Sequence, residues 1–297
     1  MTSTDHHTPT HPPAGPDPIR VPERHRPTEI APDTWVIHAT VGEGEGPVAV
    51  HMNSMVIRGA EPVVVDTGLP EHRHQYLEDL FSIVEPEDVR WVFITHEDAD
   101  HAGNVDAVMA ACPNATLVAS WFLCQRLAGV LRDVPPVRWR WVGHGETFEA
   151  GDRTLAAVRP PLYDAPTTRG LFDTRTGVYW ASDCYSTPVA QSTVYVEDLD
   201  PQFWADGFAA FQHWNSPWLS IADRGAFAAE CRAIEDLRPS TIATCHGPTI
   251  EASHVATAFD LLRALPDVPV PPQPGQIVLD EIIASFAANA SFAGSAS

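Results

Sequence analysis

Lysine is missing from this chain of 297 residues, and all 18 of its basic residues are arginine. The absence excludes a lysine nucleophile and any mechanism that passes through a lysine Schiff base. Positive charge is scarce in general, because 39 acidic residues give a formal net charge of -21. Nucleic acid and anionic membranes would repel such a chain, so we expect neither as a partner.

Cysteine and long apolar runs are also scarce. The five cysteines are scattered, odd in number and without a CxxC pair, so we expect reduced thiols. No apolar run approaches the roughly 18 residues that suggest a transmembrane helix. The first residues lack the basic and then apolar pattern of a secretory signal. These absences predict a soluble, cytoplasmic protein.

Proline marks the two ends of the predicted domain. Residues 1–27 contain seven of the 28 prolines and four of the 14 histidines, without apolar periodicity, and we predict a disordered tail. Residues 28–265 form the predicted domain. For residues 266–297 the pattern predicts a proline-rich linker and an amphipathic helix. The apolar stripe of this helix contains Leu279, Ile282, Ile283 and Phe286. A stripe of this kind has to dock on this chain or on a copy of it, so a homodimer is one expectation.

Inside the domain, short apolar runs bounded by turn-forming residues predict β-strands. The runs are TWVIHA, VAVHMNSMVIRG, PVVVDTG, VRWVFITH, ATLVAS, RTLAAVRP, GVYWASD and STIATCHG. Residues 72–84 and 223–237 carry apolar side chains at helical spacing, and Asp200 followed by Pro201 predicts the start of another helix. Clustered strands followed by helices predict an α+β protein with packed sheets and outer helices.

The stretch FITHEDADHAGN, residues 93–104, puts two histidines and three acidic side chains into six positions at a predicted strand end. A solvated acidic loop is one interpretation, and a cation site is the other. Imidazole supplies a neutral nitrogen, and carboxylate supplies charge and a second oxygen that can bridge. The candidate ligands are His96, Asp98, Asp100 and His101, which can serve two ions but cannot complete either coordination shell alone.

Two further candidate ligands, Asp183 and His246, each follow a predicted strand, in VYWASDC and TIATCHGP. Taken singly, such a residue is more often a turn or cap residue. Combined with the turn at His96–His101, the pair predicts a binuclear metal site at the ends of several strands.

The order of these motifs is similar to that of the metallo-β-lactamase superfamily across residues 30–260. They are DTG at residues 66–68, THEDADH at 95–101, SD at 182–183 and HGP at 246–248. The resemblance implies a metallo-β-lactamase-like four-layer αββα sandwich, with the metals at the sheet edge between its halves. It also implies that Asp66 is a structural residue that steadies the metal loop.

Asp98 indicates the branch of the superfamily. Hydrolases of the family usually read His-x-His-x-Asp-His, whereas this chain has a carboxylate at the second ligand position. That carboxylate resembles the flavodiiron and oxygen-binding diiron proteins, whose pattern is His-x-Glu-x-Asp-His. The resemblance implies His96 and Asp98 on a first iron, Asp100, His101 and His246 on a second, and Asp183 as the bridge. Hard oxygen ligands favour iron or manganese over zinc.

The chain departs from both branches in one respect. Their motif has another histidine between the turn and the bridging aspartate, but no histidine lies between His144 and His213 here. By alignment the position falls at Tyr163 and Asp164. Either Tyr163 or Asp164 is a ligand, or the first metal has an open position, or that metal site is empty.

Three functions follow from this resemblance. The first is a diiron protein that binds or reduces dioxygen, nitric oxide or peroxide. The chain ends soon after the predicted domain, so its electrons would come from a separate reductase. The second is a non-catalytic oxygen sensor. The third is a hydrolase of an ester, thioester, lactone or phosphoester that uses a metal-bridging hydroxide, with Tyr163 or Arg169 as oxyanion donor and zinc as the alternative metal.

Overall fold

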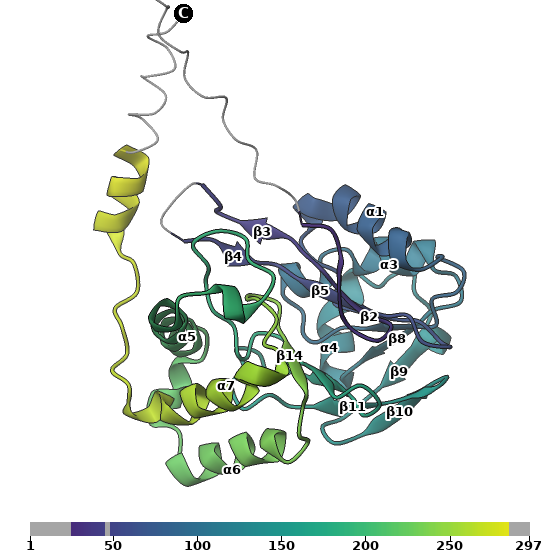
Figure 1. Cartoon of the computed structure of the whole chain (residues 1–297). Coiled ribbons are helices and arrows are strands. Elements are labelled where there is room, and N and C mark those ends of the chain that lie inside the picture. Colours follow the sequence, from purple (N-terminus) through teal and green to yellow (C-terminus); the bar gives the residue numbers. More distant parts are fainter. Residues whose placement is uncertain (1–24, 45–47, 285–297) are drawn as a thin grey trace, which may run out of the picture.

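Two β-sheets pack face to face in the computed structural model, and helices cover their outer sides (Figure 1). The structure describes residues 25–44 and 48–284. One apolar cluster lies between the sheets, and one lies between each sheet and its helices. This four-layer arrangement confirms the predicted αββα sandwich.

The first sheet has seven strands in the order β1-β2-β5-β6-β7-β8-β9. They are β1 (Thr28–Ala31), β2 (Thr34–Ile37), β5 (Ser54–Ile57), β6 (Val63–Val65), β7 (Trp91–Phe93), β8 (Thr116–Ala119) and β9 (Trp139–Trp141). Strands β6 to β9 are parallel. Their carboxyl ends therefore meet at one edge of the sheet.

The second sheet has five strands in the order β10-β11-β12-β13-β14. They are β10 (Thr147–Ala150), β11 (Arg153–Val158), β12 (Gly170–Asp173), β13 (Val178–Trp180) and β14 (Thr241–Ala243). Only β13 and β14 pair in parallel within this sheet. A short hairpin of β3 (Thr40–Val41) and β4 (Val50–His51) lies beside the sheets.

The helices cover the two outer faces. The first sheet is covered by α1 (Arg73–Ile83), α3 (Val105–Ala111) and α4 (Trp121–Arg126), and the short α2 (Ala99–Ala102) lies in the turn that follows β7. The second sheet is covered by α5 (Pro201–Asn215), α6 (Arg224–Glu235) and α7 (Ala252–Ala264). Within the described residues, none of the helices is both long and apolar enough to span a membrane.

Strand β6 shows why its continuous apolar sequence suits this architecture. Val63 and Val65 face the cluster between the sheets, whereas Val64 faces the helices on the outer side. Both faces of the strand are buried, so the sequence does not alternate between apolar and polar residues. The three side chains are fully shielded from solvent.

Each of the eight predicted strand runs contains a strand, and the run at residues 48–59 contains both β4 and β5. The predicted helices are α1, α5 and α6, and Asp200 caps α5 by accepting from the backbone N–H groups of Gln202 and Phe203. Residues 276–284 are helical, as predicted, and Phe286 lies outside the described residues. Most of the predicted tail, residues 1–24, also lies outside them.

Candidate metal centre

The turn after β7 is tied to the end of β6 through Asp66. The Asp66 Oδ1 atom accepts from the backbone N–H of Thr95 at 2.8 Å. The Asp66 Oδ2 atom lies 2.9 Å from His101 Nδ1 and accepts from Trp180 Nε1 at 2.9 Å. Asp66 is fully buried and thus connects both sheets to the turn, which is the steadying role that we expected for it.

A glycine allows this turn to pack closely. A side chain at Gly103 would place its Cβ 2.2 Å from the Ala99 carbonyl oxygen and 2.7 Å from the Gly68 carbonyl oxygen. The neighbouring Asn104 donates to the carbonyl oxygens of Thr67 and Leu69 at 2.7 and 2.9 Å. The sequence HAGN therefore holds α2 against the loop that follows β6.

Parallel strands β13 and β14 bring Asp183 and His246 to the same place. Asp183 Oδ1 lies 2.8 Å from His101 Nε2 and 3.3 Å from His246 Nε2. Asp183 Oδ2 lies 3.6 Å from His96 Nε2. Asp183 is 3% exposed, so one buried carboxylate lies between all three imidazoles. This is the position that a bridging ligand requires.

In each of the three histidines, the Nδ1 atom contacts a residue on the side of the ring that faces away from the cluster. His101 Nδ1 donates to Asp66, and His246 Nδ1 donates to the His51 carbonyl oxygen at 2.9 Å. His96 Nδ1 lies 3.2 Å from the hydroxyl oxygens of Thr95 and Ser182. These contacts leave the Nε2 atoms directed at the centre, as the hydrogen-bond partners of metal-binding histidines commonly do.

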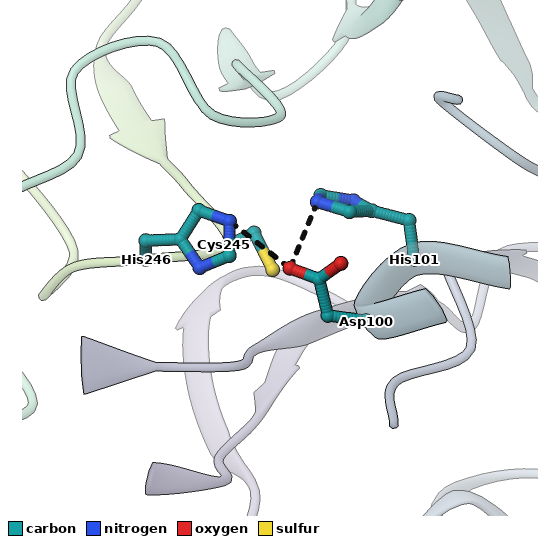
Figure 2. A group of neighbouring side chains, drawn as sticks. All are labelled: Asp100, His101, Cys245 and His246. Carbon is teal, nitrogen blue, oxygen red and sulfur yellow. Dashed lines mark ion pairs between the residues drawn. The ribbon is translucent and has the colours of Figure 1, made fainter. Parts of the chain in front are cut away.

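One half of the centre is formed by Asp100, His101, Cys245 and His246 (Figure 2). The Asp100 carboxylate lies between the two rings, with Oδ2 3.6 Å from His101 Nε2 and 3.2 Å from His246 Nε2. The sulfur of Cys245 lies beside them, and this thiol is fully buried. A cation here would have two imidazole nitrogens and carboxylate oxygens around it.

The other half is formed by His96, Asp98 and Asp164. The two carboxylates lie 3.9 and 3.8 Å from His96 Nε2. The Asp98 side chain is 54% exposed, whereas those of Asp183 and His96 are buried. This half is therefore the one that solution can reach.

Asp164 occupies the position at which the expected histidine is missing. Of the two residues considered there, Asp164 lies in the cluster and Tyr163 does not. The Tyr163 ring packs against Trp218, with centroids 5.0 Å apart, and the Tyr163 carbonyl oxygen accepts from Trp218 Nε1. Of the two residues, the structure therefore places the Asp164 carboxylate next to His96 and the Tyr163 ring next to Trp218.

The electrostatics of the cluster show a concentration of negative charge around the imidazoles. Burial opposes ionisation of Asp183, but His96, His101 and His246 outweigh it and hold the pKa of that carboxyl well below its usual range. Burial also opposes protonation of His101 and His246, yet Cys245 and Asp183 outweigh it and raise the pKa of both imidazoles well above the usual range. The surrounding acidic groups thus stabilise positive charge at the imidazoles of His101 and His246.

The donor set fits a pair of metal ions. Within the described residues, His96 Nε2, His101 Nε2 and Asp183 Oδ1 are buried and have no hydrogen-bond partner. His101 Nε2 and Asp183 Oδ1 lie 2.8 Å apart as an ion pair. Buried polar atoms without hydrogen bonds cost about 1–3 kcal/mol each. Donor atoms that converge on one point in this way are an arrangement that a bound cation would satisfy.

Sequence reasoning missed three residues of this site. Strand alternation would point Cys245 away from its neighbour His246, but its sulfur lies among the donors of Asp100, His101 and His246. His51 supplies its backbone carbonyl to His246, which no side-chain pattern reveals. Asn215 at the end of α5 donates to Asp183 Oδ2 at 3.3 Å. The sequence predicted only the start of this helix, so it gave no signal for Asn215.

Comparison with known proteins supports the same architecture. Residues 48–162 match the model of the metallo-beta-lactamase superfamily. A putative diflavin flavoprotein A 2 from Nostoc sp. is 31% identical over 149 residues, which are 50% of this chain and 25% of that protein. This chain spans about a quarter to a third of the length of the first such relatives.

Solved structures show the same fold. Rubredoxin oxygen:oxidoreductase from Desulfovibrio gigas superposes with a TM-score of 0.68 at 18% identity, over 82% of this chain and 62% of that one. The flavodiiron protein from Giardia intestinalis superposes with a TM-score of 0.67 at 19% identity, over 82% of this chain and 60% of that one. Both similarities concern the two-sheet core described above.

Proposed function

We propose that this chain, which carries a metallo-β-lactamase domain related to flavodiiron cores, is a non-heme diiron protein that reduces dioxygen. The observation that carries the proposal is the convergence of three imidazole Nε2 atoms on Asp183, flanked by Asp98 and Asp164 on one side and Asp100 on the other. His96, Asp98 and Asp164 would hold the first iron. Asp100, His101 and His246 would hold the second, and Asp183 would bridge.

The balance of charge supports iron over zinc. Four carboxylates, from Asp98, Asp100, Asp164 and Asp183, match the four charges of two divalent ions. Hard oxygen donors favour iron or manganese, whereas hydrolytic zinc sites commonly use histidine-rich sets with an open position. A centre that is nearly neutral is also a weak Lewis acid for anionic substrates.

The surroundings of the centre argue against the hydrolytic alternative. Electrophilic stabilisation of an acyl or phosphoryl group needs a donor aimed at the developing charge. The two side chains that we considered as oxyanion donors make their contacts with other residues, since the Tyr163 ring packs on Trp218 and Arg169 Nη1 donates to the Thr168 carbonyl oxygen at 2.6 Å. This arrangement favours the oxygen-reducing function over the hydrolytic one.

The residues of the chain determine how a small molecule reaches the site. When bound, two irons would supply the electrons that dioxygen accepts. Asp98 is exposed and marks the side from which a small ligand enters, whereas Asp66, His101 and Asp183 are buried and keep bulk water from the other side. Asn215 and Gln212 of α5 donate to the side chain and backbone carbonyl of Asp183, so α5 fixes the bridging position.

The electrons would come from a separate protein. The relatives are named flavoproteins. We propose that a flavin or another redox group, carried by a reductase or electron carrier, supplies these electrons.

Oxygen consumption by protein purified in air tests the proposal. We expect two irons per chain by elemental analysis and oxygen uptake when a small chemical reductant is added. Two irons with no uptake would instead indicate an oxygen sensor. Zinc in both positions, together with hydrolysis of a model thioester, would contradict the proposal.

A further inference from the structure

Glu97 lies between two candidate metal ligands in the sequence, but it is not one of them. Its neighbours are His96 and Asp98. Among the described residues, Glu97 belongs to none of the three groups of side chains that could hold a metal ion. Its side chain is nevertheless only 14% exposed. A carboxylate that is largely shielded from water needs hydrogen-bond donors or an opposite charge beside it.

Each oxygen of the Glu97 carboxylate has a partner from a different segment. The Oε2 atom accepts from the Thr167 hydroxyl, and the Oε1 atom forms an ion pair with Arg126 Nη1. Arg126 is the last residue of α4, and Thr167 lies in the loop between β11 and β12. The guanidinium also balances the charge of Glu97, which would otherwise add to the carboxylates of the centre. Glu97 therefore joins the turn after β7 to two other segments.

The loop between β11 and β12 also carries Asp164, and it is held on both sides of that residue. On one side, the Tyr163 carbonyl oxygen accepts from Trp218 Nε1 at 2.8 Å. On the other side, the hydrogen bond to Glu97 comes from Thr167, three residues after Asp164. Thr167 is 1% exposed, so water does not compete for its hydroxyl group. The position of Asp164 is thus set between two fixed points.

The half of the centre formed by His96, Asp98 and Asp164, here called the exposed half, depends on where this loop lies. His96 and Asp98 belong to the turn after β7, whereas Asp164 belongs to the loop before β12. The side chains of Asp98 and Asp164 are 54% and 23% exposed, so little packing fixes them. A contact that already holds the two segments together lowers the cost of ordering them when an ion binds.

An aspartate at position 164 makes this contact more important than a histidine would. The carboxylate oxygens of an aspartate lie closer to its own backbone than the Nε2 atom of a histidine does. The loop therefore has to bring the backbone of Asp164 nearer to the ion. In the structure the Asp164 Oδ1 atom lies 3.8 Å from His96 Nε2, and the hydrogen bond between Thr167 and Glu97 fixes the loop in that place.

We propose that Glu97 is a positioning residue for the metal of the exposed half. Through Thr167 it holds Asp164 within reach of the ion, and it does not itself contact the ion. This inference rests on the proposed function, which places a metal ion in each half. Removing a hydrogen-bond partner of this kind typically lowers metal affinity by about 10–100-fold. Loss of the contact should therefore weaken the exposed half and leave the other half unchanged.

Titration of the full chain with Co²⁺, after a chelator has removed its resident metal, tests the proposal through the visible absorption of the bound ion. We expect the wild type to bind two Co²⁺ ions per chain. Thr167→Val removes the hydroxyl and keeps the shape of the side chain, so it should weaken one of the two sites by about 10–100-fold. Thr167→Ser keeps the hydroxyl and should restore the affinity. Wild-type affinity for both ions in Thr167→Val would overturn the proposal.

A double-mutant cycle with Asp164→Ala shows whether the contact acts through Asp164. Asp164→Ala alone should weaken the same site. Adding Thr167→Val to it should then change the affinity by less than about twofold, because the residue that the contact positions is already gone. Glu97→Ala should behave in the cycle as Thr167→Val does. Equal losses with and without Asp164 would show that Thr167 and Glu97 act by another route, which contradicts the positioning role.

Thr154→Val is the matched control, because Thr154 Oγ1 donates to Glu149 Oε2 at 2.8 Å. Thr154 lies at the opposite end of β11 from the loop that carries Asp164. The variant loses the same kind of hydrogen bond and should keep both Co²⁺ affinities. A wild type that binds fewer than two Co²⁺ ions would contradict the proposed binuclear centre and the positioning role with it. Two ions in the wild type and an unaffected Thr167→Val would contradict the positioning role alone.

Discussion

Asp183 contributes to the centre more than any other single residue, because its carboxylate lies near all three histidines. Asp183→Ala should remove both metals, since it deletes the shared oxygen ligands and leaves three imidazoles without a counter-charge. We expect metal content to fall from two ions per chain to nearly none by elemental analysis. Asp79→Ala, at a buried carboxylate of α1, is a control for general destabilisation. Two retained ions in the Asp183 variant would contradict the assignment.

Asp164 and Tyr163 offer a matched pair of neighbouring residues. Asp164 lies 3.8 Å from His96 Nε2, whereas the Tyr163 ring lies on Trp218. Asp164→Ala should therefore lower the occupancy of one metal of the two, and Tyr163→Phe should leave both the metal content and the optical spectrum unchanged. The measurement is elemental analysis with an absorption spectrum of each variant. A loss of metal from the Tyr163 variant would show that the assignment is reversed.

At the scale of single residues, the sequence identified the candidate ligands that share a motif and missed contacts that depend on backbone position. His96, Asp98, Asp100 and His101 stand together in one stretch. The carbonyl of His51 belongs to no motif, because any residue type can supply a backbone oxygen. Cys245 follows a strand whose residues alternate between faces, but the chain turns after Ala243, so alternation no longer predicts its direction.

At the scale of elements, helix α5 connects the fold to the centre. Asp200 caps its first turn by accepting from Gln202 and Phe203 at 3.0 and 2.9 Å, and Gln212 and Asn215 at its other end bond to Asp183. Asp200→Ala should lower the free energy of unfolding by about 1 kcal/mol, a typical cost of losing such a cap. Urea denaturation measures it, and Asp206→Ala, at an exposed acidic residue of the same helix, is the control. An equal loss in both variants would contradict the capping role.

Two strands that the sequence did not predict share a physical cause. β9 (Trp139–Trp141) and β12 (Gly170–Asp173) are short, and neither has an apolar run with a clear period. Strand β12 begins at a glycine and exists because it pairs with β11 on one side and β13 on the other. Such strands are determined by tertiary pairing rather than by local preference. The buried strands β6, β7 and β8, by contrast, were visible as uninterrupted apolar runs.

At the scale of the whole molecule, two buried histidines near the β3–β4 hairpin predict how stability depends on pH. Burial, with the charges of His51 and His25, lowers the pKa of His38 from 6.5 to about 3. Burial likewise lowers the pKa of His51 from 6.5 to about 4. Below pH 6.5 the unfolded chain takes up protons that the folded chain does not, so the free energy of unfolding falls as the pH falls.

The contribution of His38 can be isolated with one variant. As the pH falls below about 6, the free energy of unfolding of His38→Gln should decrease less steeply than that of the wild type. The difference in slope should reach up to about 1.4 kcal/mol per pH unit. Urea denaturation of both proteins at several pH values, with the metal content matched, measures this difference. Parallel curves for the two proteins would mean that His38 takes up a proton in the folded state.

The architecture of the molecule was predictable because its motifs mark the ends of parallel strands. The surface that the apolar stripe of residues 276–284 covers was not predictable, since a lone stripe does not identify its partner. What unites the three scales is a single claim, that the ends of β7, β13 and β14 deliver their side chains to one binuclear centre.

Anomalous diffraction at the iron absorption edge, from crystals of protein purified in air, tests that claim most directly. The account predicts two iron peaks on either side of the Asp183 carboxylate, one next to His96 and Asp164 and the other next to His101 and His246. Peaks only at the zinc edge would refute the diiron assignment. A map with no metal between these side chains would contradict the centre itself.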